Sequence, residues 1–377
     1  MLEERAYWLA WSQVAGIGPV LLRRIQQRFG TLAEAWQAPN LAIAEVEGIG
    51  GHLLGTIKQV RSQLNPEQLL EQHSLKNPHF WTPVDADYPH LLLEIPSSPP
   101  VLYYRGQVDL TENQGIRPTV GIVGTREPSE YGKRSTRQIS AALARHGFTV
   151  VSGMAAGIDT EAHHGCLEAG GRTIGVLGTG VDVVYPPRNF SLYEQIQQQG
   201  LVVSEYPAGT QPNRRNFPQR NRIIAGLSRA VLVMEAPNKS GALITAYQAN
   251  EFCRDVYALP GRIDDEKSRG CLGLLNRGAH VIMSVGHLLD MLGAIPELDS
   301  AKQAEQLSLF TPEQPKEVPN LAPELAQVLL ILSSEPKAFD LIVQQAGMNA
   351  GKVSSSLLQL ELLGLASQLP GMQYRRC

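Results

Sequence analysis

The sequence predicts an α/β fold with a doubly wound, mostly parallel sheet at its centre. Between residues 79 and 292, short β-branched runs alternate with stretches of helical periodicity. The runs are nearly continuous in apolar residues, which is typical of strands that helices cover on both faces. They comprise residues 120–123, 149–151, 173–177, 201–203, 230–234, 256–258 and 281–283. We therefore expect a Rossmann-like domain over residues 79–292.

The segment ahead of this domain, residues 1–65, is predicted to be a small all-α domain of helix-hairpin-helix (SAM-like) type. Apolar residues recur at helical spacing, as at Leu21, Leu22, Ile25 and Phe29.

Two glycine turns, residues 16–19 and 48–51, interrupt the helical pattern. Both are hairpins of the hGxG type, whose backbone amides can hold a DNA phosphate without reading the base sequence. A purely structural role explains them equally well. Glu45 and Glu47 flank the second hairpin and would repel a phosphate, so the first hairpin is the better candidate.

Composition changes again behind the sheet. Residues 294–319 are rich in Pro, Glu and Gln without periodicity, which predicts a flexible linker. Residues 320–377 are predicted to form a winged-helix domain, because three short helical patterns precede a β-prone tail. Its third helix carries Lys352 as its one cation and also Glu361, which favours a protein-interaction or regulatory role over DNA reading. The helical patterns cover residues 325–332, 338–346 and 350–363.

Bulk properties favour a globular, cytoplasmic protein. Hydrophobic residues make up 43% of the chain and charged residues 18%. No apolar run reaches the roughly 18 residues that a membrane span needs, and the acidic start does not resemble a secretory signal. The 4 cysteines are scattered, which indicates reduced thiols. The net charge of −3 does not exclude a nucleic-acid partner, because local charge decides binding.

Glycines and polar residues follow three predicted strands in succession. In a doubly wound sheet such strand ends open onto the binding crevice, where backbone N–H groups face an anion. Arg126 can make a bidentate contact with a phosphate there. For that motif alone, an ordinary turn with a solvated arginine is an equal alternative. The residues are Gly124, Thr125 and Arg126, then Ser152, Gly153 and Gly157, then residues 178–180.

The most lopsided charge distribution lies between Glu205 and Glu235, a stretch that holds five arginines and no acidic residue. Pro218 fits an early helical position, so a helix is predicted from there to Leu227. A helix start attracts anions, and Phe217 beside it can stack a base. A solvated basic face is the alternative, and the missing acidic partners argue against it. The predicted contacts are Arg214, Phe217, Arg220, Asn221 and Arg222.

A further anion-binding element follows the next buried strand. Lys239, Ser240 and Gly241 place a cation, a hydroxyl and bare backbone at the start of another helix. We expect this element to face the same crevice from the opposite side.

Catalysis is not predicted. The GxGxxG fingerprint is absent after the first strand, and no GxxxxGK[ST] loop occurs. Asp159 and His163 could share a helical face, but no third metal ligand follows at suitable spacing. We interpret them as a helix N-cap and a structural histidine, and expect no catalytic residue, metal or cofactor. The competing hypothesis is a nucleotide-processing enzyme that uses Glu205 or Asp159 as acid or base, which a nucleotide panel would reveal.

These motifs, in this order, resemble the DNA-processing protein DprA family, also called Smf. They cover most of residues 79–292, and the two flanking segments also look like the family. The matching residues are 124–126, 152–153, 157–159, 162–163, 178–182, 185–186, 204–207, 217–224, 240–241, 245 and 260–261.

The resemblance implies a protein without enzymatic turnover. It implies sequence-independent binding and protection of incoming single-stranded DNA, loading of the RecA recombinase, and a homodimer formed through the Rossmann-like domain, in natural transformation and homologous recombination. One departure is Ala156, where many relatives carry a basic residue, so a charge contact would be missing here. The resemblance places phosphate contacts on Gly124, Arg126, Ser152, Gly153, Arg220, Asn221, Arg222, Ser240 and Gly241.

Overall fold

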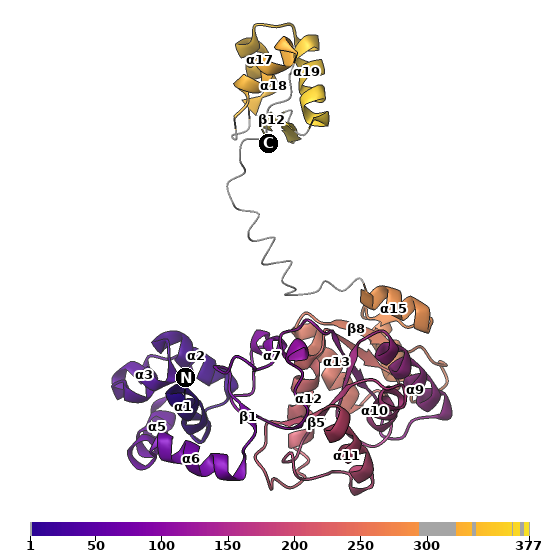
Figure 1. Ribbon diagram of the computed structural model, residues 1–377. Helices are drawn as coiled ribbons and strands as arrows, with labels where there is room; N and C mark the ends of the chain where they lie inside the picture. The colour runs from indigo at the N-terminus through magenta and orange to yellow at the C-terminus, as the bar shows by residue number, and fades with distance from the viewer. Residues whose placement is uncertain (1, 294–321, 334–336, 364, 370–372, 377) are drawn as a thin grey trace. The chain divides into compact units, whose positions relative to one another are not determined.

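The structure is a computed structural model that describes residues 2–293, 322–333, 337–363, 365–369 and 373–376 (Figure 1). The chain divides into two compact units, Met1–Ala304 and Glu305–Cys377. The linker predicted at residues 294–319 lies outside the described residues.

Within the described ranges, no helix combines the length and the apolar character that a membrane crossing requires.

Helices form the segment ahead of the sheet, as the apolar spacing predicts. Leu22 and Ile25 are fully buried and pack in one cluster with Trp11, Trp36 and Ile57. Helical structure continues to Lys76. The helices are α1 (Leu2–Ser12), α2 (Pro19–Phe29), α3 (Leu32–Gln37), α4 (Asn40–Ala44), α5 (Gly51–Gln63) and α6 (Pro66–Lys76).

Both predicted glycine hairpins lead directly into a helix. Gly18 is the N-cap of α2 and Gly50 is the N-cap of α5, and neither has a side-chain cap. The carboxylates near the second hairpin are paired: Glu45 lies 2.9 Å from Arg28, and Glu47 lies 3.6 Å from Arg24. Their repulsion of an anion is therefore weaker than the sequence suggests.

The nine-stranded sheet has the order β1-β2-β6-β5-β4-β3-β7-β8-β9. Strands β3 to β9 are the predicted runs, and all of them pair in parallel. Strands β1 and β2, which the sequence did not predict, add an antiparallel edge through β6. The strands are β1 (Phe80–Trp81), β2 (Leu102–Gly106), β3 (Thr119–Val123), β4 (Thr149–Ser152), β5 (Thr173–Leu177), β6 (Leu201–Ser204), β7 (Ala230–Val233), β8 (Asp255–Ala258) and β9 (His280–Val281).

Helices cover both faces of the sheet, so each central strand contributes to two cores. In β7, Ala230 and Leu232 belong to the cluster with α9, α10 and α15, whereas Val231 and Val233 belong to the cluster with α12 and α13. This double burial explains why the strands are apolar without alternation. The helices are α7 (His90–Glu94), α8 (Leu110–Asn113), α9 (Glu130–Arg145), α10 (Ile158–Glu168), η1 (Pro187–Asn189), α11 (Phe190–Gln199), α12 (Asn216–Leu227), α13 (Gly241–Glu251), α14 (Arg269–Leu275) and α15 (Val285–Gly293).

The strand order reverses between β3 and β7. From β3 the chain winds outward through β4, β5 and β6, then returns to start again at β7 on the other side of β3. The loops that leave β3 and β7 therefore diverge to opposite faces. Such a switch point opens a crevice at the carboxyl ends of the strands, where doubly wound proteins bind ligands.

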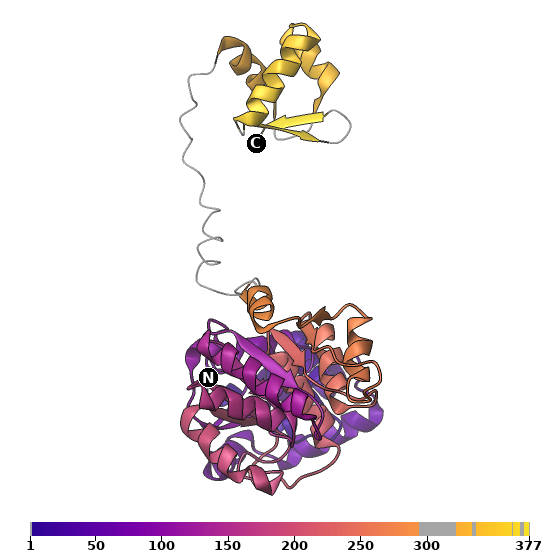
Figure 2. The ribbon, with the colours of Figure 1, turned by 90° about the vertical axis from the view of Figure 1, so that its right-hand side faces the viewer.

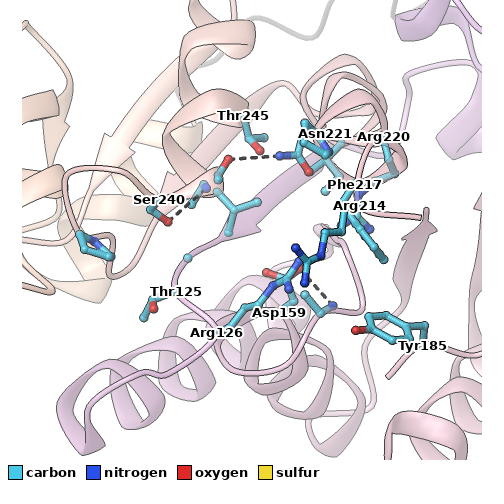
Figure 3. A pocket seen from close by; sticks show the side chains of 18 residues that line it. Thr125, Arg126, Asp159, Tyr185, Arg214, Phe217, Arg220, Asn221, Ser240 and Thr245 are labelled. Carbon is cyan, nitrogen blue, oxygen red and sulfur yellow. Dashed lines mark hydrogen bonds between the residues drawn. The ribbon is translucent and has the colours of Figure 1, made fainter. Parts of the chain in front are cut away.

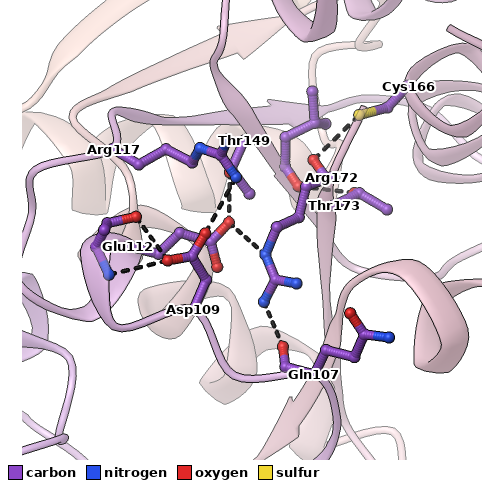
Figure 4. A network of polar contacts seen from close by, with 10 residues as sticks. Gln107, Asp109, Glu112, Arg117, Thr149, Cys166, Arg172 and Thr173 are labelled. Atoms are coloured by element: carbon purple, nitrogen blue, oxygen red, sulfur yellow. Dashed lines mark hydrogen bonds and ion pairs between the residues drawn. The ribbon is translucent and has the colours of Figure 1, made fainter. Parts of the chain in front are cut away.

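At the opposite end of the strands, a buried polar network fixes the segment before β3 (Figure 4). Glu112 on α8 is 5% exposed and accepts hydrogen bonds from Arg172 Nε at 2.7 Å and Thr149 Oγ1 at 2.5 Å. Arg172 also donates to the Gln107 carbonyl. The network connects α8 to the amino ends of β4 and β5.

We expect Glu112→Gln to lower the free energy of unfolding by about 2 kcal/mol, because the nearly buried Arg172 guanidinium loses its counter-charge and keeps only a neutral acceptor. Urea denaturation monitored by circular dichroism measures the change. Glu71→Gln, on the exposed side of α6, is the control and should stay within about 0.5 kcal/mol. Equal effects of the two substitutions would contradict the prediction.

The second unit has the predicted winged-helix layout. Its helices pack around Val328, Ile342, Val353, Leu357 and Leu360, all buried. In α19 the one cation, Lys352, is paired with Glu324 at 2.7 Å. The elements are α17 (Pro323–Ile331), β10 (Lys337–Ala338), α18 (Phe339–Ala346), α19 (Ala350–Leu362), β11 (Ala366–Leu369) and β12 (Gln373–Arg376), with strand order β10-β12-β11.

Candidate functional site

A cavity of about 650 Å³ opens at the switch point, beside the carboxyl ends of β3 and β7 (Figure 3). The loop after β3 and the start of α12 form part of its wall, and the start of α13 closes the other side. The lining residues are Val123, Gly124, Thr125, Arg126, Ala155, Asp159, Tyr185, Arg214, Phe217, Pro218, Arg220, Asn221, Ile224, Pro237, Ser240, Gly241, Ala242 and Thr245.

This cavity brings together most of the predicted binding residues. Those that line it are Gly124, Thr125, Arg126, Arg214, Phe217, Arg220, Asn221, Ser240 and Gly241. Gly153 lines a smaller cavity of about 70 Å³, which shares Arg126, Tyr185 and Phe217 with the first. Ser152, Gly157, Arg222 and Lys239 line neither.

Gly124 and Gly157 allow two loops to interlock beside the cavity. A Cβ on Gly124 would lie 2.5 Å from the Ile158 side chain, and one on Gly157 would lie 2.5 Å from the Thr125 carbonyl oxygen. Gly157 also has φ +86°, which favours glycine. The Thr125 N–H donates to the Glu235 carbonyl at 2.7 Å. That amide, expected to face an anion, is therefore already used within the protein.

The start of α13 is built as the sequence predicts. Ser240 is the N-cap, and its hydroxyl accepts from the Ala242 N–H at 3.3 Å. A Cβ on Gly241 would meet nothing within 4 Å, so the backbone there is open. Asn221 Nδ2 donates to the Gly241 carbonyl at 3.1 Å, which connects α12 to α13 across the cavity. The helix start carries a partial positive charge toward the space between them.

Arg220, a predicted phosphate contact, lines the cavity, but the residue is only 3% exposed and its guanidinium is hydrogen-bonded inside the protein. It donates to the carbonyls of Gly153 and Val176, at the ends of β4 and β5. Asp159 lies beside it, and a Cβ on Gly153 would come within 2.6 Å of both side chains. Burial lowers the pKa of Arg220 to about 10, while Asp159 acts in the opposite direction. Both of these hydrogen bonds come from Nη1, so Arg220 supports the cavity wall, while its buried Nε has no hydrogen-bond partner among the described residues.

Asp159 is not the helix N-cap that the sequence suggested. Gly157 occupies that position, and Asp159 stands in the first turn of α10, where its carboxylate accepts from the Ala155 N–H at 3.3 Å. Burial raises the pKa of Asp159 to about 6, although Arg220 favours the charged form.

Arg222 does not line the cavity and has an acidic partner, which corrects the expectation that the arginine stretch lacks one. Two nitrogens of its guanidinium each lie 2.7 Å from a Glu205 oxygen, and Nε donates to the Ser97 carbonyl. Ser152 is fully buried and donates to the Ile122 carbonyl at 2.6 Å. Lys239 is exposed in the loop before α13.

Two cations remain open to the cavity. Arg126 and Arg214 are exposed, and neither forms an ion pair with any residue that the structure describes. The Arg126 guanidinium lies 5.5 Å from the centre of the Phe217 ring, and the Tyr185 ring lies 5.4 Å from that of Phe217 (Figure 3). Tyr185 was not among the predicted site residues, although its position after the third glycine-bearing strand end was a usable signal.

The residues considered for catalysis are engaged elsewhere. His163 is fully buried, and its Nδ1 lies 2.7 Å from Thr173 Oγ1, as for a structural histidine. Glu205 is held by Arg222, and Asp159 is buried beside Arg220. Among the described residues, no group of three His, Cys, Asp or Glu side chains is placed to hold a metal ion.

Comparison with known proteins decides the family. Residues 79–293 match the family described as DNA recombination-mediator protein A, and residues 312–372 match the DprA winged helix domain. The chain belongs to the DprA/Smf family. Protein Smf from Synechocystis sp. is 55% identical over 99% of both chains. DNA processing protein DprA from Streptococcus pneumoniae is 41% identical over 62% of this chain and 84% of its own.

Two solved structures support the DprA/Smf assignment. The X-ray structure of S. pneumoniae DprA aligns with a TM-score of 0.67 and 35% identity, covering 77% of this chain and 98% of that chain. DprA from Helicobacter pylori, whose structure was described for its single-stranded DNA binding mode, aligns with a TM-score of 0.51 and 29% identity, covering 56% and 95% of the two chains.

Proposed function

We propose that this DprA/Smf protein binds single-stranded DNA in the cavity between β3 and β7. The observation that carries the proposal is the charge of the cavity wall. Arg126 and Arg214 are exposed and unpaired among the described residues, while the single lining carboxylate, Asp159, is buried beside Arg220. The H. pylori relative, described as binding single-stranded DNA, supports the choice of ligand.

Phosphates are held from two sides in this proposal. Arg126 and Arg214 supply exposed cations, and the start of α13 at Ser240 and Gly241 supplies a helix N-terminus with open backbone. Contacts of this kind recognise the sugar-phosphate backbone and carry no base information. They support binding that is independent of sequence.

An aromatic surface beside the cations receives a base. Phe217 is half-buried and forms a tilted pair with Tyr185, leaving a ring that both cavities share. Stacking of a base on an aromatic side chain contributes roughly 1–3 kcal/mol and tolerates every base. Lining by two exposed arginines and two aromatic rings suits a strand better than a small anion.

We extend the proposal to the cellular role that the family indicates. The protein protects incoming single-stranded DNA and loads the RecA recombinase in natural transformation and homologous recombination, acting as a homodimer without enzymatic turnover. Family membership supports this role. The pairing of Glu205 with Arg222 bears only on the absence of turnover, because it occupies one of the two carboxylates considered as acid or base.

Arg126→Ala is expected to weaken binding of oligothymidylate about tenfold, because one charge-assisted phosphate contact is lost. The plot of log affinity against log salt should become shallower by about 0.7. Fluorescence anisotropy at several salt concentrations measures both quantities, and Arg214→Ala should behave alike. Arg262→Ala, in a loop outside the cavity, is the control. Unchanged affinity in both cavity variants would rule out this site.

A further inference from the structure

A second groove, of about 680 Å³, runs between α9 and α10, and residues of these two helices line it. The two helices lie side by side (Figure 2). They approach closely because Gly165 has no side chain: a Cβ there would lie 2.6 Å from the Arg137 carbonyl oxygen. The floor of the groove is therefore a tight helix crossing, and long polar side chains form its walls.

The groove has more cations than carboxylates. Lys133 is paired with Glu130, and Arg137 is paired with Glu161 and lies 3.5 Å from Glu168. These pairs use every acidic residue that lines the groove.

Two arginines are left over. Arg134 and Arg145 are exposed, and within the described part of the chain neither makes an ion pair or a side-chain hydrogen bond. They fall on one stripe of α9 with Gln138 and Ala141, at successive intervals of four, three and four residues. At 1.5 Å per residue, the two guanidinium-bearing positions are about 16 Å apart along the helix, a distance that spans several phosphates of a strand.

The groove starts next to the cavity. Arg126 lines the cavity, and α9 begins at Glu130, four residues later. Asp159 lines the cavity from the first turn of α10. Both helices therefore leave the cavity rim together, and the groove between them extends from their first turns to Arg145 in the last turn of α9.

We propose that single-stranded DNA leaving the cavity continues along this groove, with Arg134 and Arg145 binding its phosphates. The proposal rests on the function proposed for the cavity. A DNA strand fits better than an acidic protein, because the groove lining holds only small apolar residues, Ala141, Gly165 and Ala169. Protein interfaces depend on large apolar or aromatic anchors, whereas a sugar-phosphate strand needs cations and a narrow floor.

The test uses the full chain and two oligothymidylates, one of roughly 6 nucleotides that fills the cavity and one of roughly 20 that extends beyond it. We expect Arg134→Gln/Arg145→Gln to bind the short strand like the wild type. For the long strand, its slope of log affinity against log salt should be shallower by about 1.4, because two phosphate contacts are lost. A matched control, Lys76→Gln/Arg262→Gln, removes the same charge from elements that line neither the cavity nor the groove.

An unchanged slope for the long strand overturns the groove as a DNA path, and so does a variant that loses only binding of polyglutamate. The two proposals fail separately. If wild type and Arg126→Ala have the same slope of log affinity against log salt on the short strand, the cavity is not a DNA-binding site. A shallower slope of Arg134→Gln/Arg145→Gln on the long strand would still support the groove.

Discussion

Arg220→Met is expected to lower the free energy of unfolding by about 3–5 kcal/mol, because it leaves a buried carboxylate without its cation. Arg220 and Asp159 are 3% and 6% exposed, so water does not replace the lost partner. The carbonyls of Gly153 and Val176 lose their donor at the same time. Urea denaturation at neutral pH measures the loss.

The double variant Arg220→Met/Asp159→Asn separates this explanation from a simple packing defect. Removing the unpaired charge should recover more than half of the stability. A single variant as stable as the wild type, or a double variant no better than the single one, would contradict the electrostatic dependence of buried Asp159 on Arg220. DNA affinity distinguishes the roles of the two arginines, because Arg220 supports the cavity wall whereas Arg126 contacts the strand. Once folded, Arg220→Met/Asp159→Asn should therefore bind single-stranded DNA more tightly than Arg126→Ala does.

The central sheet was predictable because its physical signal is local. Strands such as β3 and β7 are buried on both faces, so each is an unbroken apolar run in the sequence. Parallel strands bring their carboxyl ends to one edge, which placed Arg126 and Ser240 in one cavity although they are far apart in the chain. Strands β1 and β2 escaped prediction because β1 spans only Phe80–Trp81 and β2 ends in exposed residues at the sheet edge.

The partners of buried charges could not be predicted in the same way. Arg222 pairs with Glu205 through the approach of α12 to the end of β6. Arg220 comes near Asp159 because the first turns of α12 and α10, on opposite faces of the sheet, both line the cavity at the carboxyl ends of the strands. The sequence between Glu205 and Glu235 contains no carboxylate. The fold supplies the carboxylates near these arginines from residues that follow other strands. Tyr185 is a different case, because its position after a glycine-bearing strand end pointed toward the cavity, although its pairing with Phe217 depends on the fold.

Acidification should act on two buried groups in opposite directions. Burial lowers the pKa of His163 from 6.5 to about 3, so the unfolded chain takes up this proton first as the pH falls below 6.5. His163 alone then removes about 3 kcal/mol of stability between pH 7 and pH 4. Burial raises the pKa of Asp159 from 3.8 to about 6, so the folded protein takes up that proton first. Below pH 6 this carboxyl restores about 3 kcal/mol, which is fully present below pH 3.8.

The two contributions nearly cancel in the wild type and are exposed by single substitutions. Relative to the wild type, His163→Gln should become more stable by about 3 kcal/mol as the pH falls from 7 to 4, and Asp159→Asn should become less stable by a similar amount. Urea unfolding of all three proteins at half-unit pH steps measures the differences, from which titrations shared by the three proteins cancel. Curves that run parallel from pH 7 to pH 4 would show that neither group is desolvated.

Because Asp159 lies in the cavity wall beside Arg220, its protonation also removes the one negative charge of that wall. DNA affinity should therefore rise below pH 6 in the wild type and stay flat in Asp159→Asn.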